Sequence, residues 1–173
     1  MRITAGKLRH RNIDVTNLET TRETQDKVRM AIFNILGQYF DGGFCLDLFA
    51  GSGAMGIEAI SRGMEKLYLN DLNKDAIKVC KLNCNKLGIE ANYYNLDYEL
   101  FLKQNNQLFD LIILDPPYKM NDVKAILDRV KPHLNKNGII VFEMAKETNY
   151  QYDALRIIKD KTYGIKRVVV YKE

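Results

Sequence analysis

The segment Leu111-Ile112-Ile113-Leu114-Asp115-Pro116-Pro117-Tyr118 joins an apolar stretch, typical of a buried strand, to a short turn. Two consecutive prolines fix the backbone and cannot extend a strand, so we expect this turn to be rigid. It would hold the carboxylate of Asp115, the backbone carbonyl of Pro116 and the ring of Tyr118 in a fixed relation. Such an arrangement suits an enzyme that acts on a planar amine.

A second junction between a strand and a turn lies upstream, where Cys45-Leu46-Asp47-Leu48-Phe49 leads into Ala50-Gly51-Ser52-Gly53. Glycines let the backbone pass close to a ligand, and the helix that follows presents unpaired N–H groups. Such a helix end could hold a phosphate or a carboxylate. A P-loop is excluded because no Gly-Lys-Ser or Gly-Lys-Thr sequence follows. The alternative is a tight turn that binds no ligand.

The pattern after the first junction alternates strands with helices. Continuous apolar strands separated by helices predict a parallel sheet covered on both faces. Near the C-terminus, two strands have only a short turn between them, which predicts an antiparallel hairpin. The predicted fold is a doubly wound, Rossmann-like α/β sheet, mostly parallel, with an antiparallel C-terminal hairpin. We expect strands at 44–48, 67–70, 91–94, 110–114, 138–142, 155–159 and 166–171, and helices at 54–62, 73–87, 97–104 and 121–134, with Gly88 and Gly138 as terminators.

Residues 1–40 are expected to form a small extension ahead of the main body at 41–173. Two short strands are predicted near residues 2–5 and 12–15, followed by a helix from Thr24 as N-cap to about Tyr39. The first 13 residues carry basic side chains and no acidic one. Clustered cations of this kind either bind phosphates or form a solvated surface. The basic residues of the extension that we single out are Arg2, Lys7, Arg9, Arg11, Arg22 and Lys27.

Length and composition indicate one soluble globular domain of 173 residues, with 46% hydrophobic residues, 28% charged residues and a net charge of +4. No apolar stretch approaches the roughly 20 residues of a membrane span, and we see no signal peptide. Three cysteines without a repeated spacing argue against a disulfide framework and for a reducing cytoplasm. No metal site is expected, because neither histidine lies near Cys80 and Cys84 in the sequence.

Acidic residues stand at the ends of four of the five expected parallel strands: Asp47, Asp71, Asp97 and Asp115. Open α/β sheets bind ligands outside the carboxyl ends of their strands, so these side chains should meet at one edge. Asp71 could accept hydrogen bonds from both hydroxyls of a ribose. Asp97 could accept one from an adenine amino group, with Tyr98 as a ring neighbour. The alternative for Asp71 and for Asp97 is capping of the following helix.

The turn at Asp115 fits the chemistry of an exocyclic amine on a nucleobase. Such an amine is a poor nucleophile, because its lone pair is delocalised into the ring. If the Asp115 side chain and the Pro116 carbonyl accept its two hydrogens, the nitrogen can become pyramidal and expose the lone pair. Tyr118 could stack on the base.

Together, the stretches 47–53 and 115–118 resemble those of class I S-adenosylmethionine-dependent methyltransferases. The whole chain is similar to the RsmD family, which methylates a guanine N2 amine in bacterial small-subunit (16S) ribosomal RNA; the supporting segments are 2–7, 26–36, 56–63 and 162–164. The resemblance implies a seven-stranded sheet whose seventh strand is antiparallel, S-adenosylmethionine as the cofactor, and an N-terminal arm on the RNA-binding side.

The resemblance also implies roles for single residues. Gly51 and Gly53 would approach the methionine part of the cofactor, Asp71 its ribose and Asp97 its adenine. The candidate RNA contacts are the six basic residues of the extension together with Thr24. The candidate cofactor residues are Asp47, Phe49, Gly51, Ser52, Gly53, Gly56, Asp71, Leu72, Asp97 and Tyr98.

The sequence departs from the family pattern where Arg22-Glu23-Thr24 replaces Arg-Pro-Thr, and where Asp71 replaces a glutamate of many relatives. Other acceptors could use the same turn, namely adenine N6 or cytosine N4 in DNA, although the chain has no separate target-recognition domain. A protein glutamine is a further acceptor, for which an Asn-Pro-Pro-Tyr turn would be expected. A non-catalytic RNA-binding module is the alternative from another class. We expect a monomer that acts on small-subunit ribosomal RNA or on the assembling subunit.

Overall fold

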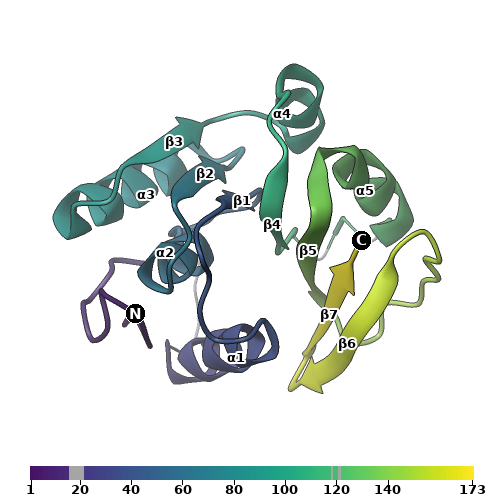
Figure 1. Cartoon of the computed structure of the whole chain (residues 1–173), viewed down its shortest axis with the longest axis horizontal. Helices are drawn as coiled ribbons and strands as arrows, with labels where there is room; N and C mark the ends of the chain where they lie inside the picture. Colours follow the sequence, from purple (N-terminus) through teal and green to yellow (C-terminus); the bar gives the residue numbers. More distant parts are fainter. Residues whose placement is uncertain (16–21, 118, 121) are drawn as a thin grey trace.

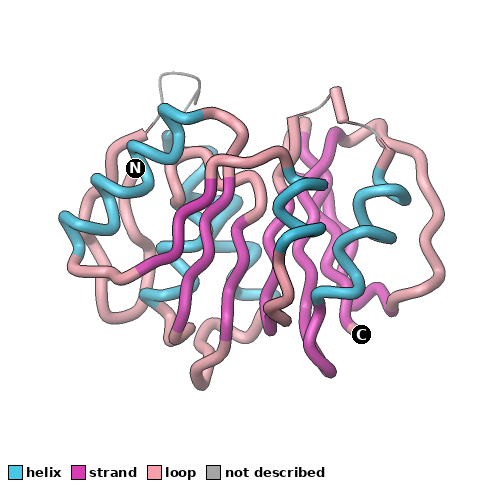
Figure 2. The backbone as a smooth tube through the Cα atoms, turned by 90° about the horizontal axis from the view of Figure 1, so that it is seen from above, coloured by secondary structure: helices cyan, strands magenta, loops and turns pink. Residues whose placement is uncertain are grey.

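The computed structural model describes residues 1–15, 22–117, 119–120 and 122–173, with no side chains described for 22–25. Its described strands form one sheet with helices on both faces (Figures 1 and 2). Within the described ranges, no helix is long and apolar enough to cross a lipid bilayer. The strands are β1 (Phe44–Asp47), β2 (Lys66–Asn70), β3 (Ala91–Tyr94), β4 (Phe109–Leu114), β5 (Leu134–Ala145), β6 (Arg156–Tyr163) and β7 (Lys166–Lys172). The helices are α1 (Arg22–Ile35), α2 (Ala54–Ser61), α3 (Lys74–Leu87), α4 (Tyr98–Gln104), α5 (Val123–Val130) and the 3-10 helix η1 (Lys131–His133).

The seven-stranded sheet has the order β3-β2-β1-β4-β5-β7-β6. Strands β1 to β5 pair in parallel, and β7 pairs antiparallel with both β5 and β6. The predicted doubly wound fold with an antiparallel C-terminal hairpin is therefore confirmed. The chain order reverses between β1 and β4, which makes the carboxyl ends of these two strands the switch point of the sheet.

Two hydrophobic cores cover the two faces of the sheet. Successive side chains of a strand point to opposite faces, so Cys45 packs in one core and Leu46 in the other. Helices α1, α2 and α3 close the first core, whereas α4 and α5 close the second. Ile3 and Ile13 from the N-terminal arm also pack in the first core, so residues 1–15, here called the arm, are anchored on the α1–α3 side.

The two predicted strands of the arm are reduced to a single antiparallel bridge between Arg2 and Asn12. The prediction of two full strands was wrong: only the amides of Ile3, His10 and Ile13 bond across the arm, and the backbone that follows Ile3 bonds to α2. The amides of Thr4 and Ala5 donate to the carboxylate of Glu58, and the amide of Lys7 donates to the carbonyl of Ser61. These bonds fix the arm to the helix that follows the glycine-rich turn.

Several predicted boundaries also differ from those observed. Helix α1 begins at Arg22, before the predicted cap Thr24, and ends at Ile35, before Gly37 and Gln38 adopt a positive φ. Gly138 does not terminate a helix: α5 ends at Val130, η1 follows, and Gly138 lies within β5. Gly88, by contrast, ends α3 with a φ of 67°, as predicted.

Candidate active site

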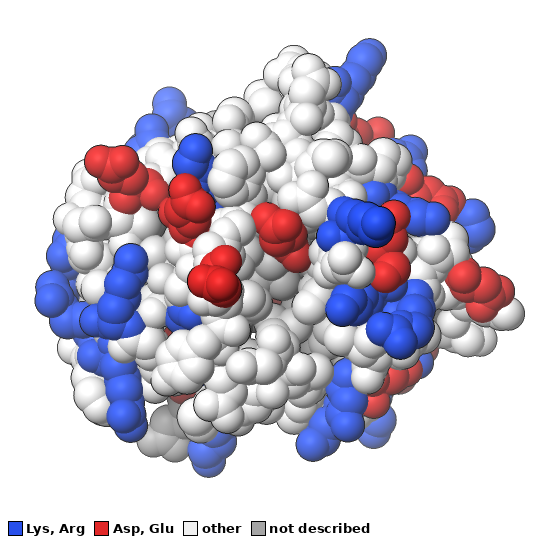
Figure 3. All heavy atoms as spheres, viewed as in Figure 1, with Lys and Arg blue, Asp and Glu red and all other residues white. Residues whose placement is uncertain are grey.

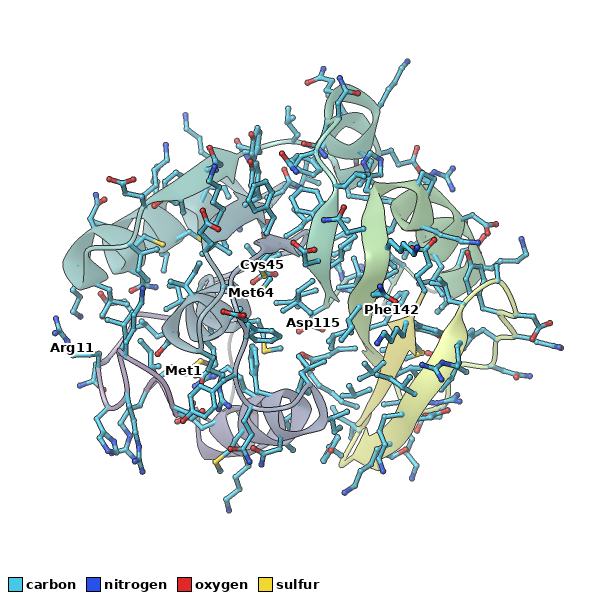
Figure 4. All side chains as sticks on the ribbon, viewed as in Figure 1. Met1, Arg11, Cys45, Met64, Asp115 and Phe142 are labelled. Atoms are coloured by element: carbon cyan, nitrogen blue, oxygen red, sulfur yellow. The ribbon has the colours of Figure 1, made fainter. Side chains whose placement is uncertain are left out.

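The candidate site lies at the switch point between β1 and β4. Asp47 is the last residue of β1 and pairs with Ile113 of β4, two residues before Asp115. The two predicted acids thus stand on neighbouring strand ends, where open α/β sheets bind their ligands. Figure 4 shows Asp115 near the centre of the molecule.

The glycine-rich turn between β1 and α2 packs closely against its surroundings. Gly51 and Gly53 both have positive φ values, 53° and 80°, which favour glycine. A Cβ at Gly56 would lie 2.7 Å from Cδ1 of Leu67. The turn therefore brings backbone and the start of α2 to the strand edge, and the packing leaves no room for a side chain at Gly56.

Asp47 ties the end of β1 to α2. Its buried carboxylate accepts a hydrogen bond from the Gly56 amide at 3.0 Å. Burial raises the pKa of Asp47 to about 7; the Gly56 bond opposes this rise, and the charges of Asp115, Asp71 and Glu143 add to it. A cationic ligand at this edge would be stabilised by the same carboxylates.

Asp71 and Asp97 differ in their local roles. Asp71 accepts from the amide of Gly51 at 2.9 Å and from that of Asn73 at 2.8 Å, so it joins the ends of β1 and β2. Asn73, rather than Asp71, is the N-cap of α3. Asp97 is the N-cap of α4 and accepts from the Glu99 amide at 2.9 Å. Asp97 therefore caps its helix, whereas Asp71 does not cap α3. A carboxylate can accept several hydrogen bonds, so the cap is compatible with a further contact to Asp97.

Apolar and aromatic side chains lie beside these acids. The rings of Phe49 and Tyr98 pack with their centroids 5.6 Å apart. Leu72 follows Asp71 directly and is 71% exposed. An exposed leucine and two rings next to hydrogen-bonding acids suit the binding of a flat heterocycle joined to a sugar.

Asp115 forms an ion pair that the sequence did not predict. Nζ of Lys166 lies 3.0 Å from Oδ2 of Asp115 and 2.8 Å from Oε2 of Glu143. Burial alone would lower the pKa of Lys166, but the two carboxylates raise it well above its ordinary value. Pro116 is buried at the start of the turn. The predicted stacking residue Tyr118 lies outside the described residues.

Two signals in the sequence could have revealed this pair. Glu143 follows the apolar stretch Ile139-Ile140-Val141-Phe142, so the fifth parallel strand also carries an acid near its carboxyl end. An antiparallel last strand begins where its parallel neighbours end, which places Lys166 at the same edge. Both residues could have been assigned to the site once the hairpin was predicted.

A second unpredicted network fixes the arm. The buried Glu58 of α2 accepts hydrogen bonds from the amide of Thr4 at 2.9 Å, its hydroxyl at 2.6 Å and the amide of Ala5 at 3.1 Å. It also pairs with Arg29 at 3.2 Å and Arg62 at 2.8 Å. Its partners come from the arm, from α1 and from the end of α2, which made the network invisible to local sequence patterns.

The basic residues of the arm are exposed. Arg2, Lys7, Arg9 and Arg11 all lie at the surface, and Arg11 points outward at the margin of the molecule in Figure 4. Figure 3 shows basic side chains gathered on the side of the arm and acidic ones nearer the middle of the same face. Lys27 of α1 is also exposed, whereas the side chains of Arg22 and Thr24 lie outside the described part.

A groove of about 430 Å³ separates the arm from α1. Basic and apolar side chains from both elements line it, and Asp26 contributes one acid. Its lining residues are Arg2, Ile3, Thr4, His10, Asp26, Lys27 and Met30.

The described residues hold no group of three or more His, Cys, Asp or Glu side chains that could bind a metal ion. Cys45, Cys80 and Cys84 are buried with free thiols. Burial raises the pKa of each thiol. These thiols therefore stay protonated in the core, where Sγ of Cys80 donates a weak hydrogen bond to the Gly51 carbonyl at 3.3 Å.

The chain matches the family described as Conserved hypothetical protein 95 over residues 1–172. It is 38% identical to YlbH of Bacillus subtilis, with 100% of this chain and 99% of the relative covered. It is 34% identical to the Ribosomal RNA small subunit methyltransferase D of Haemophilus influenzae, with 99% and 93% covered. Among solved structures, yhhF from Escherichia coli superimposes with a TM-score of 0.88 at 26% identity, covering 100% of this chain and 97% of that one. The chain therefore belongs to this family, which is the RsmD family that its motifs predicted.

Proposed function

We propose that the chain transfers a methyl group from S-adenosylmethionine to the exocyclic N2 amine of a guanine in small-subunit ribosomal RNA. The observation that carries this proposal is the position of Asp115 and Pro116 next to the glycine-rich turn at the switch point. A methyl donor and an acceptor amine could meet there. The relative from Haemophilus influenzae is named a ribosomal RNA small subunit methyltransferase, which supports the substrate class.

The donor set at the strand ends fits S-adenosylmethionine, which carries a positive sulfonium and an ammonium group. The carboxylates of Asp47 and Asp71 suit these charges and the ribose hydroxyls, while Asp97 and the ring of Tyr98 suit the adenine. Phe49 and Leu72 would cover the base, and the backbone at Gly51, Ser52, Gly53 and Gly56 would border the methionine part. When bound, the cofactor supplies an electrophilic methyl group.

The residues after β4 would prepare the acceptor. The Asp115 side chain and the Pro116 carbonyl accept the two hydrogens of the amine, so the nitrogen becomes pyramidal and its lone pair can attack. Tyr118 stacks on the base. Holding the reactants in line is the main source of rate, since alignment alone can supply roughly 7–11 kcal/mol. The guanine has to leave its stack to enter the site.

The N-terminal residues 1–40 would bind the RNA. Arg2 and Lys27 line the groove, and Lys7, Arg9 and Arg11 are exposed on the arm, so these cations could track phosphates of the RNA. Arg22 and Thr24 of α1 remain candidate RNA contacts from the sequence. Because the arm is bonded to α2, RNA held there is presented at a fixed distance from the switch point. We place the enzyme in the cytoplasm with its ribosomal substrate, acting as a monomer.

The substitution Asp115→Ala tests the proposal. It removes the acceptor for one hydrogen of the amine and the group that later takes its proton, so we expect loss of methyl transfer with unchanged binding of S-adenosylmethionine in calorimetry. Loss of both methyl transfer and cofactor binding would make Asp115 a structural residue. Retained transfer would contradict the proposed role. Purified protein that binds RNA and ignores S-adenosylmethionine would favour the non-catalytic RNA-binding alternative.

A further inference from the structure

Lys166 bridges two carboxylates at the carboxyl edge of the sheet. Its Nζ donates to Oδ2 of Asp115 at 3.0 Å and to Oε2 of Glu143 at 2.8 Å. The antiparallel direction of β7 is the reason for this position, since Lys166 pairs with Ala145 at the end of β5. Because β7 runs opposite to β5, its first residue lies at the edge where the parallel strands end.

The contact differs from an ordinary surface ion pair, because the Glu143 side chain is only 6% exposed. Burial raises the pKa of Glu143 to about 7, the charge of Asp115 adds to this rise, and Lys166 opposes it. A buried carboxylate needs a partner to remain charged. Lys166 meets this need, and its own side chain is only 28% exposed, so Glu143 restricts where the ammonium can lie.

Lys166 is not required to hold the hairpin on the sheet. The strands β5 and β7 pair continuously from Ile139 with Lys172 to Ala145 with Lys166. Val168 and Val170 pack in one core, while Val169 and Tyr171 pack in the other. These contacts hold β7 on the sheet without an ion pair. The specific effect of the Lys166 contact is therefore to orient Asp115.

We infer that Lys166 is a positioning residue of the proposed methyl-transfer site: anchored by Glu143, it fixes the Asp115 carboxylate toward the acceptor amine. This inference rests on the proposed function. The hydrogen bond from Lys166 ends on Oδ2 of Asp115, so Oδ1 can accept a hydrogen of the amine. Glu143 does not touch the substrate and acts through Lys166.

Lys166 keeps its positive charge through the whole methyl transfer. The nitrogen–carbon bond forms as the carbon–sulfur bond breaks, and the electron pair of that bond stays on sulfur. The methylated nitrogen then loses one proton to Asp115, which releases it to solvent. Lys166 keeps its proton throughout and stabilises the Asp115 carboxylate until that transfer.

Other charged groups face this cluster, and they determine its response to pH. Asp47 at the end of β1 and Asp71 after β2 add negative charge, while Arg29 of α1 contributes positive charge toward Glu143. Without the Lys166 ammonium, the edge would carry mostly negative charge, which would raise the pKa values of its carboxyl groups. The acidic limb of the pH–rate profile would then move to higher pH.

The experiment compares Lys166→Met, Lys166→Arg and Glu143→Gln with Lys172→Met, a matched change at the other end of β7. We measure kcat and KM for the RNA substrate, the Kd for S-adenosylmethionine and the pH dependence of kcat. Lys166→Met should lower kcat by roughly 10²-fold at neutral pH, recover partly at higher pH, and leave KM and Kd little changed. Lys166→Arg should restore much of kcat, Glu143→Gln should give an intermediate loss, and Lys172→Met should match wild type.

Two results would overturn the inference. One is a Lys166→Met enzyme with the kcat of wild type. The other is a loss that is equal at every pH, is not rescued by arginine, and comes with a lowered Tm; the pair would then be structural. If wild type itself binds S-adenosylmethionine but methylates no ribosomal RNA, the proposed function fails and this inference with it. If wild type is active, the variants test the inference alone.

Discussion

The buried carboxylate of Glu58 should determine whether the arm stays attached, and the substitution Glu58→Gln tests this. The change preserves size and one acceptor oxygen but replaces the other oxygen with an amide that donates. In the native chain both oxygens accept: Oε1 from Thr4 Oγ1, the Ala5 amide and Arg62, and Oε2 from the Thr4 amide and Arg29. In either orientation of the glutamine amide, its NH₂ group would face N–H or O–H donors that now bond to a carboxylate oxygen.

The expected cost follows from the burial of the partners. The side chains of Arg29 and Arg62 are only 3% and 2% exposed, so both guanidinium groups would remain buried beside a neutral residue. Breaking a buried ion pair costs about 3–5 kcal/mol. Because Asp26 still pairs with Arg29 at 2.8 Å, we expect the lower end, about 3 kcal/mol. For a chain of this size that loss lowers Tm by roughly 6–12 °C.

The assay combines urea denaturation with hydrogen exchange. Glu58→Gln should lower the free energy of unfolding, and the amides of Ile3 and Ile13, which bond across the arm, should lose protection before those of the sheet. Glu90→Gln, at an exposed position, is the matched control. Equal stability of the two variants, with an arm that remains protected, would refute the assignment of Glu58 as the residue that holds it.

Three further predictions concern the two binding surfaces. Gly56→Ala places a Cβ 2.7 Å from Cδ1 of Leu67 and disturbs the hydrogen bond from the Gly56 amide to Asp47. Calorimetry should therefore show weaker binding of S-adenosylmethionine, and unchanged affinity would mean that this turn does not bind the cofactor. The pKa of Asp47 is raised to about 7, and a cationic cofactor favours the charged carboxylate. The affinity for S-adenosylmethionine should therefore increase as pH rises toward about 7 and then level off, with a proton released to the buffer; a flat profile would contradict the placement of the cofactor beside Asp47. Arg11→Gln should weaken RNA binding and reduce its salt slope by about 1, whereas Lys136→Gln, near the amino end of β5, should leave both unchanged; the same effect from both variants would argue against an RNA surface on the arm.

The sequence was sufficient for the features that depend on local pattern. Alternating apolar strands and helices predicted the doubly wound sheet, Gly88 ended α3 because a left-handed residue is needed there, and the short turn before Lys166 predicted the C-terminal hairpin. Gly138 was misread, since a glycine next to a helical pattern also fits the start of a strand.

The features that depend on distant partners could not be predicted in the same way. Glu58 is bonded to residues 53 and 54 positions away in the chain, and the backbone of Thr4 and Ala5 bonds to it rather than to a second strand. The pair of Lys166 with Asp115 depends on the exact register of β7 on β5. The acids at the strand ends were found from sequence because topology alone brings them to one edge. Topology also places Lys166 at that edge, but its pairing with Asp115 and Glu143 follows from distances that only the structure gives.

The central claim is that the chain methylates guanine N2 in small-subunit ribosomal RNA. We would measure transfer of labelled methyl from S-adenosylmethionine to small ribosomal subunits lacking the modification, to their naked RNA and to duplex DNA, and then identify the modified nucleoside. We predict N2-methylguanosine in one or both RNA samples, and the ratio between them would show whether the assembled subunit presents the base. Label in DNA alone, or a different nucleoside in the RNA, would contradict the claim.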